Sequence, residues 1–360
     1  MPIVVNSNTT ATIASFNLSH ANDALRKSLA RLSSGKRIVS PADDAGGMAV
    51  AYKLNSKLNR TEAVRQNVQN GISYLQVQDG ALSTIAKIAD RMSELRTMAS
   101  DVTKNTGDVE NYSKEFIELQ RQLNQIRHEK FNGISLFATS QSSATSTSPE
   151  LRPPLDKQGM TLDESGRSYA KFSREILTTA DGVRRDGHVS LNVVNLQYVL
   201  SIGQVDTRFV STTAATAANV TGQTAESING RAVYLNLGNV DNGNQDDFGG
   251  SGTTAYDEIY TSDGYLKSIL FVSIGSFTDI IGRIADIRAE NGAEQNRLNM
   301  TSALLIQNQT NLEAAHGRIM DADVALESTR FARQNVLVQS SAAMVAQANQ
   351  LTSIALTILG

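Results

Sequence analysis

Apolar residues near the N-terminus recur at the spacing of an α-helix. Steps of three and four residues bring side chains to one face of a helix. Gly35 follows the series, at the position where a glycine commonly ends a helix. We therefore predict a helix that ends at Gly35. The series is Leu18, Ala21, Leu25, Leu29 (with Ser28 as the alternative at that step) and Leu32.

A much longer periodic run follows Ser40 and Pro41. A serine, a proline in the first turn and the acid Asp43 three residues after the serine are typical of a helix start. The steps continue to Ala99, which predicts a helix over about 42–100, far longer than the mean of about 11–12 residues. Such a length indicates a coiled coil or rod. The run includes Val64, Val68, Ile72, Leu75, Leu82, Ile85, Ile88, Met92, Leu95 and Ala99.

Further helices are expected on both sides of the middle of the chain. Residues 109–127 and 276–319 carry the same steps, and "FNGISLF" (131–137) has the pattern of a turn into a strand. The last forty residues carry one more stripe. Its members are Leu337, Ser341, Met344, Ala348, Leu351, Ala355 and Ile358.

The middle of the chain has a different composition. Residues 138–160 are rich in Ser, Thr and Pro and are predicted to be a linker. Residues 161–275 alternate short β-prone runs (188–201, 231–238 and 268–275) with Gly, Asn and Asp clusters. Eleven of the 19 Tyr and Phe residues lie between 169 and 277, so we expect a small core there.

The predicted fold class is mainly α: a long coiled-coil-like helical rod made from both chain ends, with a β-rich variable domain inserted in the middle. The expected domains are a terminal coiled coil (1–35 and 320–360), a linker (36–44), a helical rod with a β-turn or hairpin (45–137 and 276–319), the linker 138–160 and a surface-exposed variable domain (161–275).

Composition excludes several classes of protein. The net charge is −3, so nucleic acid is not an expected partner. The chain has no cysteine, which excludes disulfides and cysteine-ligated zinc. No stretch reaches the roughly 20 apolar residues of a membrane span. Residues 1–30 lack the apolar block of a cleavable signal, so we expect a cytoplasmic protein or export by another route.

The terminal stripes are too weak to order the chain ends alone. Ordering a residue costs about 1–2 kcal/mol of backbone entropy, whereas a fully buried Leu or Ile contributes about 1.5–3 kcal/mol. Several stripe positions are Ala or Ser. We therefore expect 1–35 and 320–360 to order fully only when neighbouring subunits cover them, which indicates a polymer.

Both termini resemble those of bacterial flagellins, the subunits of flagellar filaments. The resemblance covers about 1–137 and 276–360. The matching motifs are "RLSSGKRIVSPADDAGGMAVA" (31–51), "NGISYLQVQDGALSTI" (70–85), "FNGISLF" (131–137), "GAEQNRLN" (292–299), "RIMDADVALES" (318–328) and "VLVQSSAAMVAQANQ" (336–350).

The resemblance implies a function and partners. The protein would be secreted through the flagellar export apparatus with an export chaperone, and would assemble with itself into an extracellular helical filament for swimming. Hook-associated junction and cap proteins would contact the filament ends. The stripe residues Leu18, Leu25, Leu29, Leu32, Leu337, Met344, Leu351 and Ile358 would carry subunit assembly.

Two alternatives and one additional contact stay open. The chain ends also resemble those of the hook–filament junction protein, and residues 161–275 could act as an adhesin or glycan binder. Four rod residues match positions at which some flagellins meet a vertebrate innate receptor, although the same surfaces serve subunit contacts. These residues are Arg91, Glu94, Leu95 and Glu118.

No residue pattern indicates catalysis. The pair Asp43 and Asp44 is expected to face the positive end of a helix dipole, and Asp321 and Asp323 to cap or pair locally. The segment "DNGNQDD" (241–247) lacks the glycine spacing of an EF-hand. The four histidines are scattered and no HExxH motif occurs. We expect no enzyme activity, no cofactor and no metal.

Overall fold

The computed structural model describes residues 8–138, 156–162, 168–181, 187–202, 237, 261 and 264–359. The chain divides into two compact units, residues 1–63 with 305–360 and residues 64–304. The expected boundaries at residues 35 and 320 fall inside the first unit, so the domain bounds remain a prediction.

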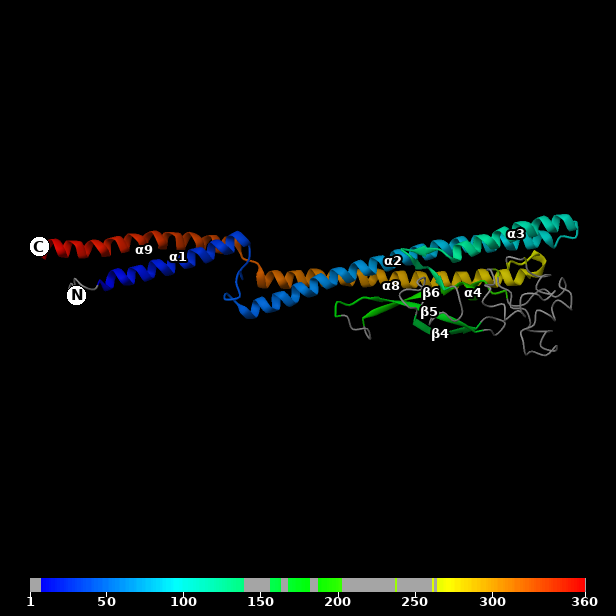
Figure 1. Cartoon of the computed structure of the whole chain (residues 1–360), viewed down its shortest axis with the longest axis horizontal. Coiled ribbons are helices and arrows are strands. Elements are labelled where there is room, and N and C mark those ends of the chain that lie inside the picture. The colour runs from blue at the N-terminus through cyan, green and yellow to red at the C-terminus, as the bar shows by residue number, and fades with distance from the viewer. Residues whose placement is uncertain are drawn as a thin grey trace. The chain divides into compact units, whose positions relative to one another are not determined.

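Two antiparallel helices, α1 (Thr9–Ser34) and α9 (Val324–Leu359), lie side by side in the first unit (Figure 1). The side chain of Asn8 accepts a hydrogen bond from Ala11 N at 3.0 Å and caps α1. Gly35 ends α1 with a φ of 66°, a left-handed conformation in which glycine has no steric penalty. The predicted end of this helix is therefore confirmed.

The helix α2 (Ala45–Ala99) begins at a different residue from the one predicted. Ser40 and Pro41 lie in a turn, where the carboxylate of Asp43 accepts hydrogen bonds from the backbone N–H groups of Val39 and Ser40. Asp44 caps α2 instead, accepting from Gly47 N at 2.8 Å. The prediction of Ser40 as the cap was wrong because the acid three residues later folds back onto the turn.

Three helices form the core of the second unit: α2, α3 (Thr106–Arg127) and α8 (Ile274–Met320). Asn105 and Asp108 form a capping box that starts α3. The rings of Phe116 on α3 and Phe277 on α8 meet edge to face, with centroids 6.5 Å apart. The mainly helical fold class is confirmed. Other fully buried core residues include Leu75, Leu82, Ile85, Met92, Leu95 and Leu123.

The motif at 131–137 forms the expected turn. Strands β1 (Lys130–Phe131) and β2 (Ile134–Ser135) pair antiparallel. Between them, Asn132 has φ 50° and Gly133 has φ 77°. Two positive φ values match the hairpin turn that Asn-Gly favours.

A four-stranded sheet follows, in the order β3–β6–β5–β4, and Figure 1 labels its strands β6, β5 and β4. Its strands are β3 (Phe137–Ala138), β4 (Asp156–Leu162), β5 (Ser168–Leu177) and β6 (His188–Asn195). Only the β3–β6 pairing is parallel among these strands. Because β4 begins at Asp156, residues 156–160 are strand rather than linker, which corrects that prediction.

The described strands pack on the helices of the second unit. Ile176 of β5 approaches Gly71 of α2 so closely that a Cβ at Gly71 would lie 2.3 Å from its Cδ1. The side chain of Gln78 on α2 donates to Leu136 O at 3.0 Å. These strands therefore belong to the same compact unit as the helices, whereas we expected a core of their own. Most of 203–263 lies outside the described residues.

Two β-prone runs differ from the prediction. Residues 188–201 are strand only to Asn195 and then turn into the short helix α4 (Leu196–Val199). Residues 268–275 are not strand: they form the 3₁₀ turn η5 (Ile269–Phe271) and the start of α8. Ser113 on α3 accepts from Ile269 N at 3.4 Å, and Arg96 on α2 donates to Val272 O at 2.6 Å. Side chains of α2 and α3 thus form the hydrogen bonds with backbone groups that a neighbouring strand would form in a sheet.

Candidate assembly surface

The facing sides of α1 and α9 are lined by small residues and a few larger apolar ones. Ser28 is buried in this interface, whereas Leu29 is 54% exposed. Of the two candidates for this position in the stripe, Ser28 and not Leu29 therefore takes part in the pairing of α1 with α9. The other inward residues of α1 include Leu18, Ala21, Leu25 and Leu32, and those of α9 include Phe331, Gln334, Val338, Ser341, Val345 and Ala348.

The predicted α9 stripe only partly matches this inward face. Ser341 and Ala348 point inward, but Leu337 and Met344 are exposed, whereas their neighbours Val338 and Val345 are half-buried. Leu351 and Ile358 lie on α9, and their side chains are outside the described residues. Leu337 and Met344 therefore do not line the pairing of α9 with α1, and the role of the stripe in contacts with other subunits remains a prediction.

Both helices also expose large apolar side chains. Phe16 on α1 is 64% exposed, and Val336 and Met344 on α9 are 65% and 62% exposed. Contiguous exposed apolar surface is typical of a site that another protein covers. Among the residues of α1 and α9 whose side chains the structure describes, these are Ile13, Phe16, Leu29, Val324, Leu326, Val336, Leu337 and Met344, which we call the outward apolar residues.

The segment after α1 pairs with the segment before α9. Ala322 N donates to Gly35 O at 3.0 Å, and Arg37 N donates to Met320 O at 2.6 Å. Lys36 and Asp321 form an isolated antiparallel bridge between these bonds. Ile38 packs with Ala51 and Met320 beside them. The two connections therefore form one joint, which we define as residues 35–44 with 320–323.

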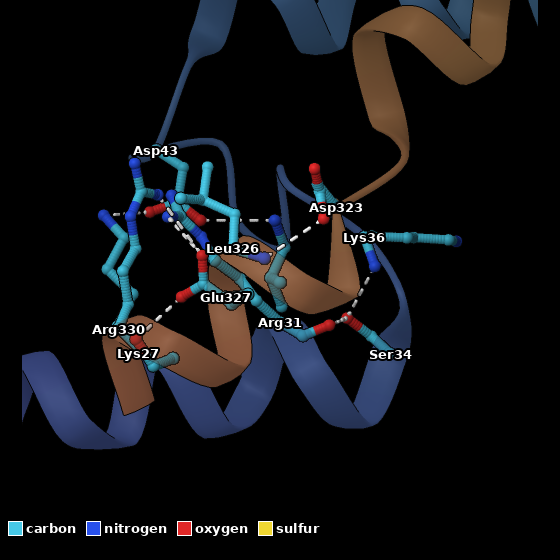
Figure 2. A network of polar contacts seen from close by, with 11 residues as sticks. Lys27, Arg31, Ser34, Lys36, Asp43, Asp323, Leu326, Glu327 and Arg330 are labelled. Carbon is cyan, nitrogen blue, oxygen red and sulfur yellow. Dashed lines mark hydrogen bonds and ion pairs between the residues drawn. The ribbon is translucent and has the colours of Figure 1, made fainter. Parts of the chain in front are cut away.

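Two acids of this joint, Asp43 and Asp323, have structural partners (Figure 2). Nζ of Lys27 lies 2.6 Å from Asp43 Oδ1. That hydrogen bond, together with those from the Val39 and Ser40 N–H groups, lowers the pKa of Asp43 from 3.8 to about 2. Asp323 caps α9 by accepting from Ala325 N and Leu326 N at 3.0 and 3.1 Å. Capping by Asp323 is thus confirmed.

The four predicted receptor-contact residues differ in exposure. Arg91 bonds to Glu115 at 2.8 Å and to Glu94 at 3.0 Å, and Glu118 pairs with Arg121; all of these residues are exposed. Leu95, in contrast, is completely buried in the core of the second unit. It can influence this surface only through packing, so direct contact by Leu95 was a wrong expectation.

The sheet is joined to α8 by an acid that the sequence pattern did not single out. Both carboxylate oxygens of Glu294 accept from Asn192 N of β6, at 3.0 and 3.1 Å. Burial raises the pKa of Glu294 from 4.5 to about 7, with a contribution from Glu290; the Asn192 N–H and Arg297 oppose the shift. The only sequence signal was an acid on an otherwise ordinary helix face.

The described part of the chain contains no group of three or more His, Cys, Asp or Glu side chains placed to hold a metal ion. Nor does any helix in the described ranges have the length and hydrophobicity needed to cross a membrane. Residues 241–247 lie outside the described residues.

Known protein families match both helical ends of the chain. Residues 5–142 match the bacterial flagellin N-terminal helical region, and residues 274–358 match the bacterial flagellin C-terminal helical region. Together these regions cover more than half of the chain and include α1, α2, α3, α8 and nearly all of α9. The chain belongs to the bacterial flagellin family, whose members are structural subunits of the flagellar filament.

Full-length relatives agree with this assignment. Polar flagellin F of Vibrio parahaemolyticus is 29% identical over 382 residues, with all of both chains covered. Flagellin FlaB2 of Treponema pallidum is 27% identical, covering 99% of this chain and 100% of the relative. Among solved structures, part of the chain is also similar in sequence to the crystal structure of Bacillus cereus flagellin, at 21% identity over 70% of this chain and 94% of that one, with a TM-score of 0.32 that carries no weight in the assignment.

Proposed function

We propose that this chain polymerises with itself into an extracellular helical filament used for swimming, and that neighbouring copies cover the outward apolar residues of α1 and α9. The exposure of Phe16, Val336 and Met344 supports this proposal most directly. Water contact with such side chains is unfavourable by about 25 cal/mol per Å² of apolar area. A non-closing contact repeated from copy to copy generates a helical polymer.

The same proposal includes secretion and partners. The chain would leave the cell with an export chaperone through the flagellar export apparatus, and would meet hook-associated junction and cap proteins at the filament ends. Its role would be mechanical, without an enzyme activity or a cofactor. A contact with a vertebrate innate receptor would use the exposed side chains of Arg91, Glu94 and Glu118.

Seeded growth of the purified chain tests polymerisation. Short filament fragments are mixed with soluble chain, and the lengths are followed by electron microscopy. We expect growth to micrometre filaments. A chain that adds only a limited layer to the seeds would contradict an unlimited polymer.

Substitutions on α9 test the surface. Val336→Glu and Met344→Glu would place a carboxylate where a neighbouring copy buries an apolar group, which is costly without a partner. Because both positions are exposed in the single chain, helix content would be unchanged while the growth rate falls at least about tenfold, the effect of roughly 1.4 kcal/mol. The matched control is Gln339→Glu, an exposed polar position on the same helix. Normal growth of both Val336→Glu and Met344→Glu would refute this surface.

Deleting 320–360 should leave a soluble rod that cannot polymerise, because α9 is lost. Intact filaments of that deletion in electron micrographs would overturn the role of this helix.

A further inference from the structure

The interface between α1 and α9 contains one buried charged group among the described residues of the first unit. Glu327 is only 4% exposed. Its Oε1 accepts a hydrogen bond from Ser28 Oγ at 2.7 Å. Its Oε2 lies 3.3 Å from Nη1 of Arg330 and 4.0 Å from Nη1 of Arg31 (Figure 2). The carboxylate thus has partners on both helices.

A second polar contact closes the far end of the helix pair. Asn8 Nδ2 donates to Ala348 O at 2.9 Å. Asn8 precedes Ser28 by 20 residues, and Ala348 follows Glu327 by 21 residues. The two contacts therefore define an antiparallel register in which facing residues have numbers that sum to 355 or 356.

The residues between these contacts specify the register poorly. In this register Ala21 faces Gln334, and Ala14 faces Ser341. A shift of one heptad would place Ala14 opposite Gln334, or Ala21 opposite Ser341, so an alanine of α1 would again face a polar side chain of α9 and the packing would change little. Heptad repeats of this kind allow several alignments unless a buried polar group favours one of them.

A one-heptad shift has a different consequence for Glu327. In one direction, Glu327 would face Ala21, whose methyl group cannot donate a hydrogen bond. In the other direction, it would face position 35, beyond the end of α1. Glu327 would keep Arg330 of its own helix but would lose Ser28 and Arg31 of α1. A buried carboxylate that loses hydrogen-bond partners carries a desolvation penalty.

We propose that Glu327, with Ser28 as its partner, sets the register in which α1 pairs with α9. Glu327 is then a positioning residue, and it selects among alignments that the apolar side chains leave nearly equivalent. The inference deepens the proposed assembly function, because the alignment of the pair decides which side chains each copy presents to its neighbours.

The absence of cysteine from the chain allows a direct test. Paired Ala21→Cys and Gln334→Cys substitutions report the observed register by forming a disulfide. Paired Ala14→Cys and Gln334→Cys substitutions report the alignment shifted by one heptad. Filaments grown from a mixture of ¹⁴N- and ¹⁵N-labelled full-length chains distinguish bonds within a chain from bonds between chains by peptide mass spectrometry.

We expect only the first cysteine pair to form an intrachain bond efficiently in the natural background. Glu327→Leu should raise the ratio of shifted to observed register at least about tenfold, because the penalty that disfavours the shift is removed. Exchanging the partners (Ser28→Glu with Glu327→Ser) should restore the natural ratio. The exchange also leaves each new pair member three residues before an arginine, Arg31 or Arg330.

Two results would overturn the proposal. One is an unchanged ratio in Glu327→Leu, and the other is a ratio in the exchanged chain that equals that of Glu327→Leu. If Glu327→Leu forms no filaments, the same bonds are measured in the soluble full-length chains. Failure of the natural chain to polymerise would count against the proposed function, whereas the register is judged only from the bond ratio.

Discussion

The ammonium group of Lys27 on α1 lies 2.6 Å from the carboxylate of Asp43 in the joint. Asp43 also accepts the N–H groups of Val39 and Ser40. This carboxylate therefore links the last turns of α1 to the chain that leads into α2. The pairing of Gly35 O with Ala322 N closes the same joint from the other connection.

Asp43 should make the joint sensitive to strong acid. Its pKa in the folded chain, about 2, is below the ordinary 3.8, so its contribution is complete above about pH 4 and is lost as the pH falls toward 2. We expect Asp43→Asn to lower the stability of the first unit by about 1 kcal/mol at pH 7. Thermal unfolding followed by circular dichroism should show this difference vanish near pH 2.

Asp44→Asn is the matched control, since asparagine also caps a helix well. Its stability should stay close to that of the natural chain. A difference in thermal stability between Asp43→Asn and the natural chain that did not change with pH would contradict the lowered pKa of Asp43.

Gly35 should contribute to stability only because glycine adopts a left-handed backbone conformation without strain. A Cβ at this position would meet no atom within 4 Å, so Gly35→Ala adds strain without a clash. We expect a loss of about 1 kcal/mol. Gly35→Asn should lose less, because asparagine visits this conformation more readily. Equal stability of all three chains in thermal unfolding would argue against this account of the helix end.

Substitutions at Leu95 and Glu94 should distinguish the stability that comes from core packing from the stability that comes from an exposed ion pair. Leu95→Ala removes a completely buried side chain and should cost about 2–5 kcal/mol. Glu94→Ala removes one exposed ion pair with Arg91 and should cost far less than Leu95→Ala, because solvent screens an exposed pair. Chemical denaturation of the full-length chains measures both values. A small cost for Leu95→Ala would contradict its place in the core.

Ionisation of Glu294 should weaken the contact between α8 and the sheet as the pH rises. Its pKa of about 7 lies above the ordinary 4.5, so its ionised form is disfavoured in the folded chain. Stability from this group is therefore greatest below about pH 4.5 and declines as the pH rises to about 7. The groups that face it are Asn192 of β6, Glu290 and Arg297 of α8, Tyr74 of α2 and Lys171 of β5.

The neutral substitution Glu294→Gln keeps an acceptor for Asn192 N and removes the charge. Its thermal midpoint relative to the natural chain should rise between pH 4.5 and 7 and then stay constant. Asp279→Asn, an exposed acid on the same helix, serves as the control and should show no such rise. If the difference in thermal midpoint between Glu294→Gln and the natural chain did not change between pH 4.5 and 7, the raised pKa of Glu294 would be refuted.

Helices and their ends could be predicted where a local rule decides the structure. Gly35 ends α1 as predicted because only its own backbone conformation matters. The start of α2 could not be predicted as well, because Lys27 and the turn at Val39 and Ser40 hold Asp43 away from the helix. The run 268–275 has β-prone residues, yet Ser113 and Arg96 bind its backbone in another conformation.

On the candidate assembly surface, too, local patterns could be predicted from the sequence and contacts between distant residues could not. Hydrophobic spacing found the helices α1 and α9, but it favoured Leu29 over Ser28 because leucine is apolar. The structure buries Ser28 because its hydroxyl meets Glu327, which is 299 residues away in the chain. Contacts between distant polar residues leave no periodic signal, so their partners could not be identified from the sequence.

A density map of the native filament at side-chain resolution, obtained by electron cryomicroscopy, would show whether neighbouring copies bury the outward apolar residues. We expect Phe16, Val336 and Met344 to be covered by residues of neighbouring copies. A map in which all three side chains face solvent would contradict this expectation.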